Sequence, residues 1–324
     1  MTVALGPFRF LSFSGGIDDL AAGKVRPDAL RDLDDRLPQP NSLRRAHEDA
    51  KAAVLAGAQL LRSAGVAASE RLGLYVGQQH MTFDYCAQFV DGSYRDGPRM
   101  TSPMLFSESV LNNVATHLSL TLGVKGVAQT FIGTRVAALQ AVLAAAEDVE
   151  EGVVDAALVV GLGVANVLTQ EAYRSLYDPL RRRNPPGLRF LRGSVAMLVR
   201  RDAPGQPRIV FGGVRCLGRS PEAQLKTLAS LWKDASVRIP KGTRLLDSTL
   251  CLARDRNPDP LRRIVPTIPP AEGLGESFAL DPFLRLLLDS VRHPGDEGRA
   301  VLCLGEEGTA SLLALDGPPR LALV

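Results

Sequence analysis

The sequence predicts an α/β fold made of two βαβαβ-type halves, with helices and sheets stacked in layers. Short apolar runs typical of strands alternate with segments of helical periodicity along the 324 residues. The order of elements starts again after residue 207, although the two halves share no detectable identity. Residues 135–146 form a helix that is apolar on nearly every face. Such a helix is buried on all sides, which places it between two sheets.

The first half is expected to span residues 1–203. Apolar residues recur with helical spacing in three segments, and compact apolar runs indicate strands between them. A segment with Gly, Pro and aromatic residues but no clean periodicity, residues 78–103, is expected to be a long functional or interface loop. The expected strands are residues 9–14, 72–77, 154–161 and 194–200, and the expected helices are 42–64, 105–122 and 135–146.

The second half is expected to span residues 204–324, after a Pro- and Gly-containing connection at 202–207. It repeats the pattern of the first half: a long apolar helix, then a strand, then a further strand. The expected strands are residues 208–214, 243–250, 300–304 and 309–315, and the expected helices are 221–235, 260–264 and 275–291.

The composition is that of a globular protein in water. Hydrophobic residues make up 45% of the chain and charged residues 23%, and the net charge is +3. That charge is too small, and too evenly spread, to indicate nucleic-acid binding. The first residues lack a basic region followed by an apolar run, and no window reaches the ~18 apolar residues of a membrane span. We therefore expect a cytoplasmic protein with no membrane span.

The cysteines give no sign of a metal or redox site. Cys86, Cys216, Cys251 and Cys303 lie far apart, without any C-x-x-C pair. Zinc and redox-motif interpretations therefore lack the spacing that they need, and a disulfide framework is not expected in a chain of this size. We expect no metal and no cofactor.

Several short motifs follow one another along the chain: SPMLF at 102–106, the Asn pair at 112–113, GVKG at 123–126, DAALVVG at 155–161, LGESFAL at 274–280 and GEEG at 305–308. In this order the chain resembles the β-ketoacyl synthase family of the thiolase superfamily, over about residues 8–317. The resemblance implies a thiolase-like fold in which the two halves form a five-layered αβαβα architecture, shortened in the second half.

The resemblance also implies where a nucleophile should lie. Family ketosynthases carry the acyl chain on a cysteine at a buried helix N-terminus, where the helix dipole favours a thiolate, and use two histidines. In this chain the cysteine position falls on Arg135. The first histidine motif falls on LDSTLCLA at 246–253, which has no histidine, and the second histidine position falls on Glu272. His47, His80, His117 and His293 occupy none of these positions.

The loss of three groups together indicates a non-catalytic homologue. Such homologues are similar to chain-length factors, which pair with an active ketosynthase as a heterodimer. The resemblance thus implies a subunit in polyketide, aryl-polyene or fatty-acid-like synthesis, with an active ketosynthase and an acyl carrier protein as partners. Two alternatives stay open: a divergent thiolase-fold acyltransferase or decarboxylase that uses Arg135 and Glu272, and a homodimeric scaffold that binds acyl chains.

Three groups of residues are candidates for the degenerate site and its surroundings. Because the cysteine and second histidine positions of the family face each other, Arg135 and Glu272 are predicted to form a buried ion pair. Cys251, near the lost histidine motif, is either a displaced nucleophile or a small buried strand residue. The densest basic cluster is a candidate docking surface for an acidic carrier protein, or else a solvated loop: Arg181, Arg182, Arg183, Arg189 and Arg192.

Overall fold

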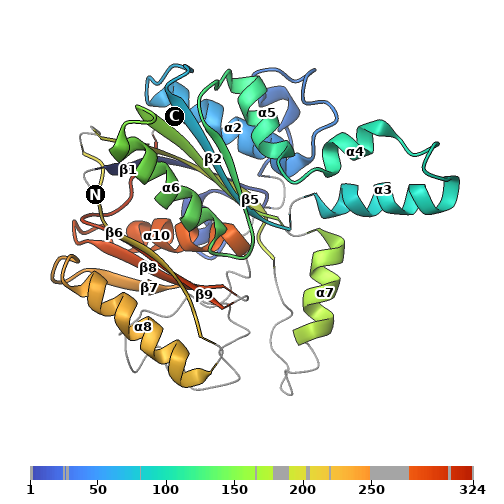
Figure 1. Ribbon diagram of the computed structural model, residues 1–324. Coiled ribbons are helices and arrows are strands. Elements are labelled where there is room, and N and C mark those ends of the chain that lie inside the picture. Colours follow the sequence, from blue (N-terminus) through green and yellow to red (C-terminus); the bar gives the residue numbers. More distant parts are fainter. Residues whose placement is uncertain are drawn as a thin grey trace.

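Two separate sheets organise the chain (Figure 1). The computed structural model describes residues 3–24, 26, 29–80, 82–164, 166–177, 190–201, 205–218, 220–248, 277–305 and 308–322. The first sheet has five strands in the order β1-β5-β4-β2-β3. Strands β2, β3 and β4 are parallel to one another, while β5 runs antiparallel to β1 and β4. The strand bounds are β1 Ala4–Ser12, β2 Leu72–Gln79, β3 Ala128–Ile132, β4 Ala156–Gly163 and β5 Gly193–Arg200.

The second sheet lies in the later part of the chain. Its order is β6-β9-β8-β7, with β7 and β8 parallel and β9 antiparallel to both of its neighbours. The strand bounds are β6 Ile209–Cys216, β7 Arg244–Asp247, β8 Arg299–Leu304 and β9 Thr309–Leu315.

The helices and sheets form five layers (Figure 1). Helices α2 (Glu48–Ser63) and α5 (Asn113–Leu122) cover the outer face of the first sheet. Helix α6 (Ala137–Glu151) contacts strands of both sheets, and α10 (Asp281–Arg292) lies beside it against the second sheet. Helix α8 (Pro221–Ser236) covers the outer face of the second sheet. The predicted αβαβα fold is therefore confirmed.

The central helix packs closely against the first sheet because small residues meet there. Gly77 on β2 pairs in register with Gly161 on β4, and both lie under Ala138 of α6. A Cβ atom built on Gly77 would lie only 2.3 Å from the Cα of Ala138. This contact explains why α6 is rich in alanine on the face that touches the sheet.

Residues 78–103 differ from the expected loop. They contain a 14-residue helix, α3 (Phe83–Asp96), which packs on α4 (Pro103–Ser109). Together these helices form an arm that projects from the body of the molecule (Figure 1). None of the residues of α3 is buried, although Phe83, Ala87, Val90 and Tyr94 recur with helical spacing.

Several expected helices have different bounds from those predicted, and for two of them the structure shows the cause. The helix expected at 42–64 begins at Glu48, because the side chain of His47 caps it by accepting a hydrogen bond from the Asp49 N–H. The helix expected at 105–122 is interrupted between α4 and α5. There the side-chain amide of Asn113 donates to the Glu108 carbonyl, at 2.8 Å, and so takes the acceptor that a continuous helix would use.

The remaining short elements connect these layers. Helix α1 (Ile17–Ala21) contacts α10, and α7 (Val167–Tyr177) follows β4 and contacts α3. A 3₁₀ turn at Asp34–Arg36 precedes α2, and another at Phe278–Leu280 leads into α10. Among the described residues, no helix is long and apolar enough to cross a membrane.

Candidate functional site

A buried guanidinium group lies where strand β3 turns into the central helix. Arg135 precedes the first turn of α6, and only 1% of its surface is exposed. Its Nη1 donates to the carbonyl oxygen of Ser248 at 2.9 Å and lies 3.8 Å from Oδ2 of Asp281. Ser248 directly follows β7 in the second sheet. The side chain therefore reaches from the first half of the chain into the second.

Asp281 is the anion at the centre of this cluster. Its carboxylate accepts hydrogen bonds from Ser248 Oγ at 2.6 Å and from Ser277 Oγ at 3.1 Å. Arg285, one turn further along α10, donates to both carboxylate oxygens from Nε and Nη2, at 3.1 Å each. Each of these side chains is buried or nearly so. The carboxylate is thus bonded to two hydroxyl groups and a guanidinium, and lies within ion-pair distance of another.

The electrostatics of the cluster follow from these contacts. Burial by itself would raise the pKa of the Asp281 carboxyl, but the charges of Arg285 and Arg135 and the hydrogen bonds outweigh it. The net result is a pKa below the usual value, so Asp281 is ionised at neutral pH. Asp281 also lies in the first turn of α10, where the helix dipole favours a negative charge.

Arg135, in contrast, lies at the positive end of α6, where a cation is disfavoured. The nearby carboxylate of Asp281 compensates for this unfavourable interaction between the Arg135 charge and the helix dipole. A guanidinium keeps its proton at any pH that a protein tolerates and has no free lone pair. The position can bind and orient an anion, but it cannot form a covalent acyl intermediate.

The sequence identified only part of this cluster. Arg135 belongs to this cluster, whereas Cys251 and Glu272 lie outside the described residues, so the pairing of Arg135 with Glu272 stays a prediction. Asp281 and Arg285 were missed. Their i, i+4 spacing at the start of a helix that follows a serine was the available signal.

The described histidines are engaged away from this cluster. His47 contacts Asp49, and His80 Nε2 lies 3.2 Å from the hydroxyl of Tyr173. His117 Nε2 lies 3.0 Å from a carboxylate oxygen of Glu108. Cys303 is buried on β8, where its thiol lies 3.7 Å from the Ser248 carbonyl oxygen. Within the described part of the chain, no group of His, Cys, Asp or Glu side chains is arranged to hold a metal ion.

The structure describes one member of the predicted basic cluster. Arg181, Arg182, Arg183 and Arg189 lie outside the described residues. Arg192 donates to the buried carboxylate of Asp49 at 3.2 Å and to Glu48 at 3.4 Å, and its guanidinium lies over the ring of Phe13. Its charge is therefore already paired within the chain.

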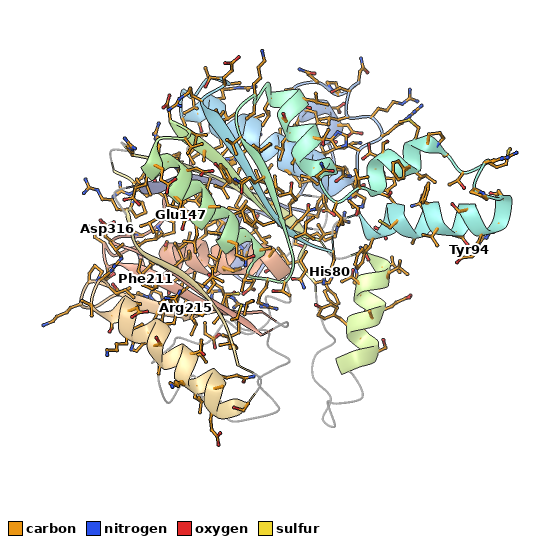
Figure 2. All side chains as sticks on the ribbon, in the orientation of Figure 1. His80, Tyr94, Glu147, Phe211, Arg215 and Asp316 are labelled. Atoms are coloured by element: carbon orange, nitrogen blue, oxygen red, sulfur yellow. The ribbon has the colours of Figure 1, made fainter. Side chains whose placement is uncertain are left out.

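Large apolar side chains are exposed on the arm and on one edge of the first sheet. Strand β3 is one of the two edge strands of the first sheet, and all of its residues are exposed or half-buried. On the arm, Tyr94 is 87% exposed and Met100 is 76% exposed, and Figure 2 shows Tyr94 far out on the arm. The other large exposed apolar residues of this surface are Phe83, Val90, Met104, Phe106, Leu111 and Ile132. We call this set the arm surface.

The chain is similar to ketosynthases in both sequence and fold. Residues 20–178 match the family model described as "Beta-ketoacyl synthase, N-terminal domain". This stretch covers α2, the arm and α6, and it includes Arg135. Residues 20–178 are therefore similar to the N-terminal domain of β-ketoacyl synthases. No curated protein sequence matches the chain significantly.

Solved structures with the same fold include ketosynthases of several kinds. The ishigamide ketosynthase/chain length factor is 18% identical, with a TM-score of 0.77, and the match covers 98% of this chain and 100% of that one. A type II polyketide synthase ketosynthase, solved with its acyl-carrier protein and bound to the hexaketide, is 14% identical with a TM-score of 0.74, over 97% of this chain and 99% of that one. A β-ketoacyl synthase from Burkholderia phymatum STM815 is 14% identical with a TM-score of 0.71, over 97% and 99% of the two chains.

Proposed function

We propose that the chain is a non-catalytic, ketosynthase-like subunit of the chain-length-factor type. It pairs with an active β-ketoacyl-acyl-carrier-protein synthase in polyketide, aryl-polyene or fatty-acid-like biosynthesis. The partner supplies the nucleophilic cysteine and performs the condensation. This chain contributes the interface and part of the wall of the cavity in which the acyl chain grows.

The observation that carries the proposal is the environment of Arg135. From the sequence resemblance we expect the nucleophile of a ketosynthase at this position, and here a buried guanidinium is bonded to the Ser248 carbonyl and lies close to Asp281. A ketosynthase cysteine has to be deprotonated and reachable by a thioester. Arg135 offers no nucleophile, and its contacts join the two halves of the chain instead.

The arm surface supports the pairing. An exposed edge strand offers unpaired N–H and C=O groups to a second chain, and large apolar side chains clustered on one surface are typical of an interface. The fold match to the ishigamide ketosynthase/chain length factor is consistent with a partner of the same fold. The segment that contains Arg181, Arg182, Arg183 and Arg189 is proposed to dock an acidic carrier protein.

The experiment is co-expression with ketosynthases encoded nearby, followed by affinity purification and native mass spectrometry. We expect a one-to-one heterodimer. Tyr94→Arg combined with Met100→Arg should abolish it, because two charges would be buried in an apolar interface. The control is Val237→Arg, which changes an equally exposed apolar residue beyond the end of α8 and should leave the complex intact.

The remaining outcomes separate this proposal from its alternatives. A homodimer that forms without any ketosynthase would indicate the scaffold. Turnover of malonyl-carrier protein by the purified chain alone would indicate the acyltransferase or decarboxylase. Either result would exclude the proposed subunit.

A further inference from the structure

Two residues between β2 and α3, where the arm leaves the body, have a strained backbone. His80 and Thr82 have φ angles of 62° and 73°, in a region that residues other than glycine rarely adopt. His80 lies at the base of the arm (Figure 2). Such a backbone persists only where the surrounding structure holds it in place. Contacts at the base of the arm therefore have to keep α3 in its position.

The first turn of α3 contacts the segment that leads into α2. The hydroxyl group of Tyr85 donates to the carbonyl oxygen of Arg45 at 3.0 Å. The ring of Tyr85 lies almost perpendicular to the ring of His47, with 5.8 Å between the two centroids. Nε2 of His47 lies 3.5 Å from Oδ2 of Asp84. His47, the N-cap residue of α2, thus contacts two residues of the arm.

The imidazole ring of His47 lies between two carboxylates. Its Nδ1 is 3.2 Å from Oδ2 of the buried Asp49 on α2, and its Nε2 faces Asp84 on α3. Arg192, just before β5, pairs with Asp49 and with the exposed Glu48. Within the described part of the chain, no lysine or arginine lies within ion-pair distance of Asp84. His47 is therefore the residue that can neutralise the charge of Asp84.

The groups around His47 act on its pKa in opposite directions. Burial and the charge of Arg192 lower the pKa of the imidazole, and the positive end of the α2 dipole also disfavours a cation. The hydrogen bond and charge of Asp49, together with the charge of Asp84, outweigh these effects and raise the pKa above its ordinary value. Since that ordinary value is about 6.5, the ring changes its charge within the physiological pH range.

The neutral and protonated rings make different contacts. In the neutral ring, Nδ1 accepts from the Asp49 N–H at 3.3 Å, so the single proton is on Nε2, which faces Asp84. In the protonated ring both nitrogens are donors, and the attraction of opposite charges is added to both carboxylate contacts. The contact between His47 and Asp84 is therefore stronger when His47 is protonated.

We propose that His47 is a pH-dependent contact between α2 and α3 that fixes the arm to the body of the molecule. The arm is attached most firmly when His47 carries a proton. This attachment is fully present below the pKa that His47 has when the arm is detached, and it weakens as the pH rises through the higher pKa of the attached form. The inference concerns contacts within the chain and does not rest on the proposed pairing with a ketosynthase.

The first test measures the pKa of His47 in the full chain by NMR of ¹⁵N-labelled histidine side chains. Asp84→Asn should lower the proton affinity of His47 by about two- to fivefold, the usual effect of losing a partly exposed ion pair. Asp91→Asn is the matched control, because it breaks an exposed ion pair with Arg95 further along α3 and should leave the pKa of His47 unchanged. An unchanged pKa of His47 in Asp84→Asn would overturn the proposal.

The second test measures the attachment of the arm by hydrogen exchange of the α3 backbone amides, corrected at each pH for the intrinsic exchange rate. Protection should be about two- to fivefold higher below the pKa of His47 than above it. His47→Asn should remove this difference, and the variant should fold because asparagine is a favoured N-cap residue.

Two outcomes of the exchange experiment would contradict the proposal. One is protection of α3 that does not change with pH in the unchanged protein. The other is the same pH dependence in His47→Asn, which would assign the effect to another group, such as His80, whose ring packs against Phe83.

Discussion

At the scale of single residues, the molecule depends on a compensated charge in its interior. Arg135 lies at an unfavourable helix end, and Asp281 at a favourable one, and the two are close enough to interact. A buried charge becomes strongly destabilising only when its partner is removed. Asp281 is therefore the residue on which the stability of this charge cluster depends most.

Asp281→Asn should lower the free energy of unfolding by about 3–5 kcal/mol, because it leaves Arg135 and Arg285 buried without their shared anion. Urea denaturation followed by circular dichroism measures this. The control, Asp234→Asn, breaks a surface ion pair with Arg215 and should have little effect.

The depressed pKa of Asp281 adds a pH dependence. Its stabilisation is fully present above the unfolded-state pKa of about 3.9 and is lost as the pH falls through the lower pKa of the folded state. The Asp281→Asn variant should lack this part of the loss of stability at acid pH. An identical acid dependence in both proteins would show that the carboxylate is not held in its ionised form.

At the scale of elements, the contact between α6 and β2 sets the distance between the central layer and the first sheet. Gly77 allows this contact because a side chain there would collide with the backbone of Ala138. The same packing holds Arg135 at the start of α6, in line with Ser248 across the layer.

Gly77→Ala should destabilise the fold by about 1–3 kcal/mol, since the added methyl group forces a backbone shift in a packed core. Thermal and urea unfolding measure the effect. Gly133→Ala serves as the matched control because a Cβ at Gly133 meets nothing within 4 Å. Equal stability of the two variants would contradict the close approach.

At the scale of the whole molecule, the layered fold could be predicted from periodicity. The all-apolar character of residues 135–146 indicated a central helix, and the repeated order of elements indicated two sheets. The arm was missed: Phe83, Ala87, Val90 and Tyr94 recur with helical spacing, but the Gly and Pro residues around them indicated a loop, and α3 buries none of its residues.

From the sequence, the site could be predicted only at the position that resembles the cysteine position of a known family. Arg135 stood out because a cysteine was expected there. Asp281 stands 146 positions away along the chain, and only the packing of α10 beside α6 brings the two together. Local spacing could not reveal that pairing.

The central claim, that this chain carries no acyl group, is tested most directly by intact-protein mass spectrometry. The purified chain and an active ketosynthase are each incubated with an acyl-carrier protein that bears an acyl thioester. The account predicts an added acyl mass on the ketosynthase and none on this chain. A covalent acyl adduct on this chain would contradict it.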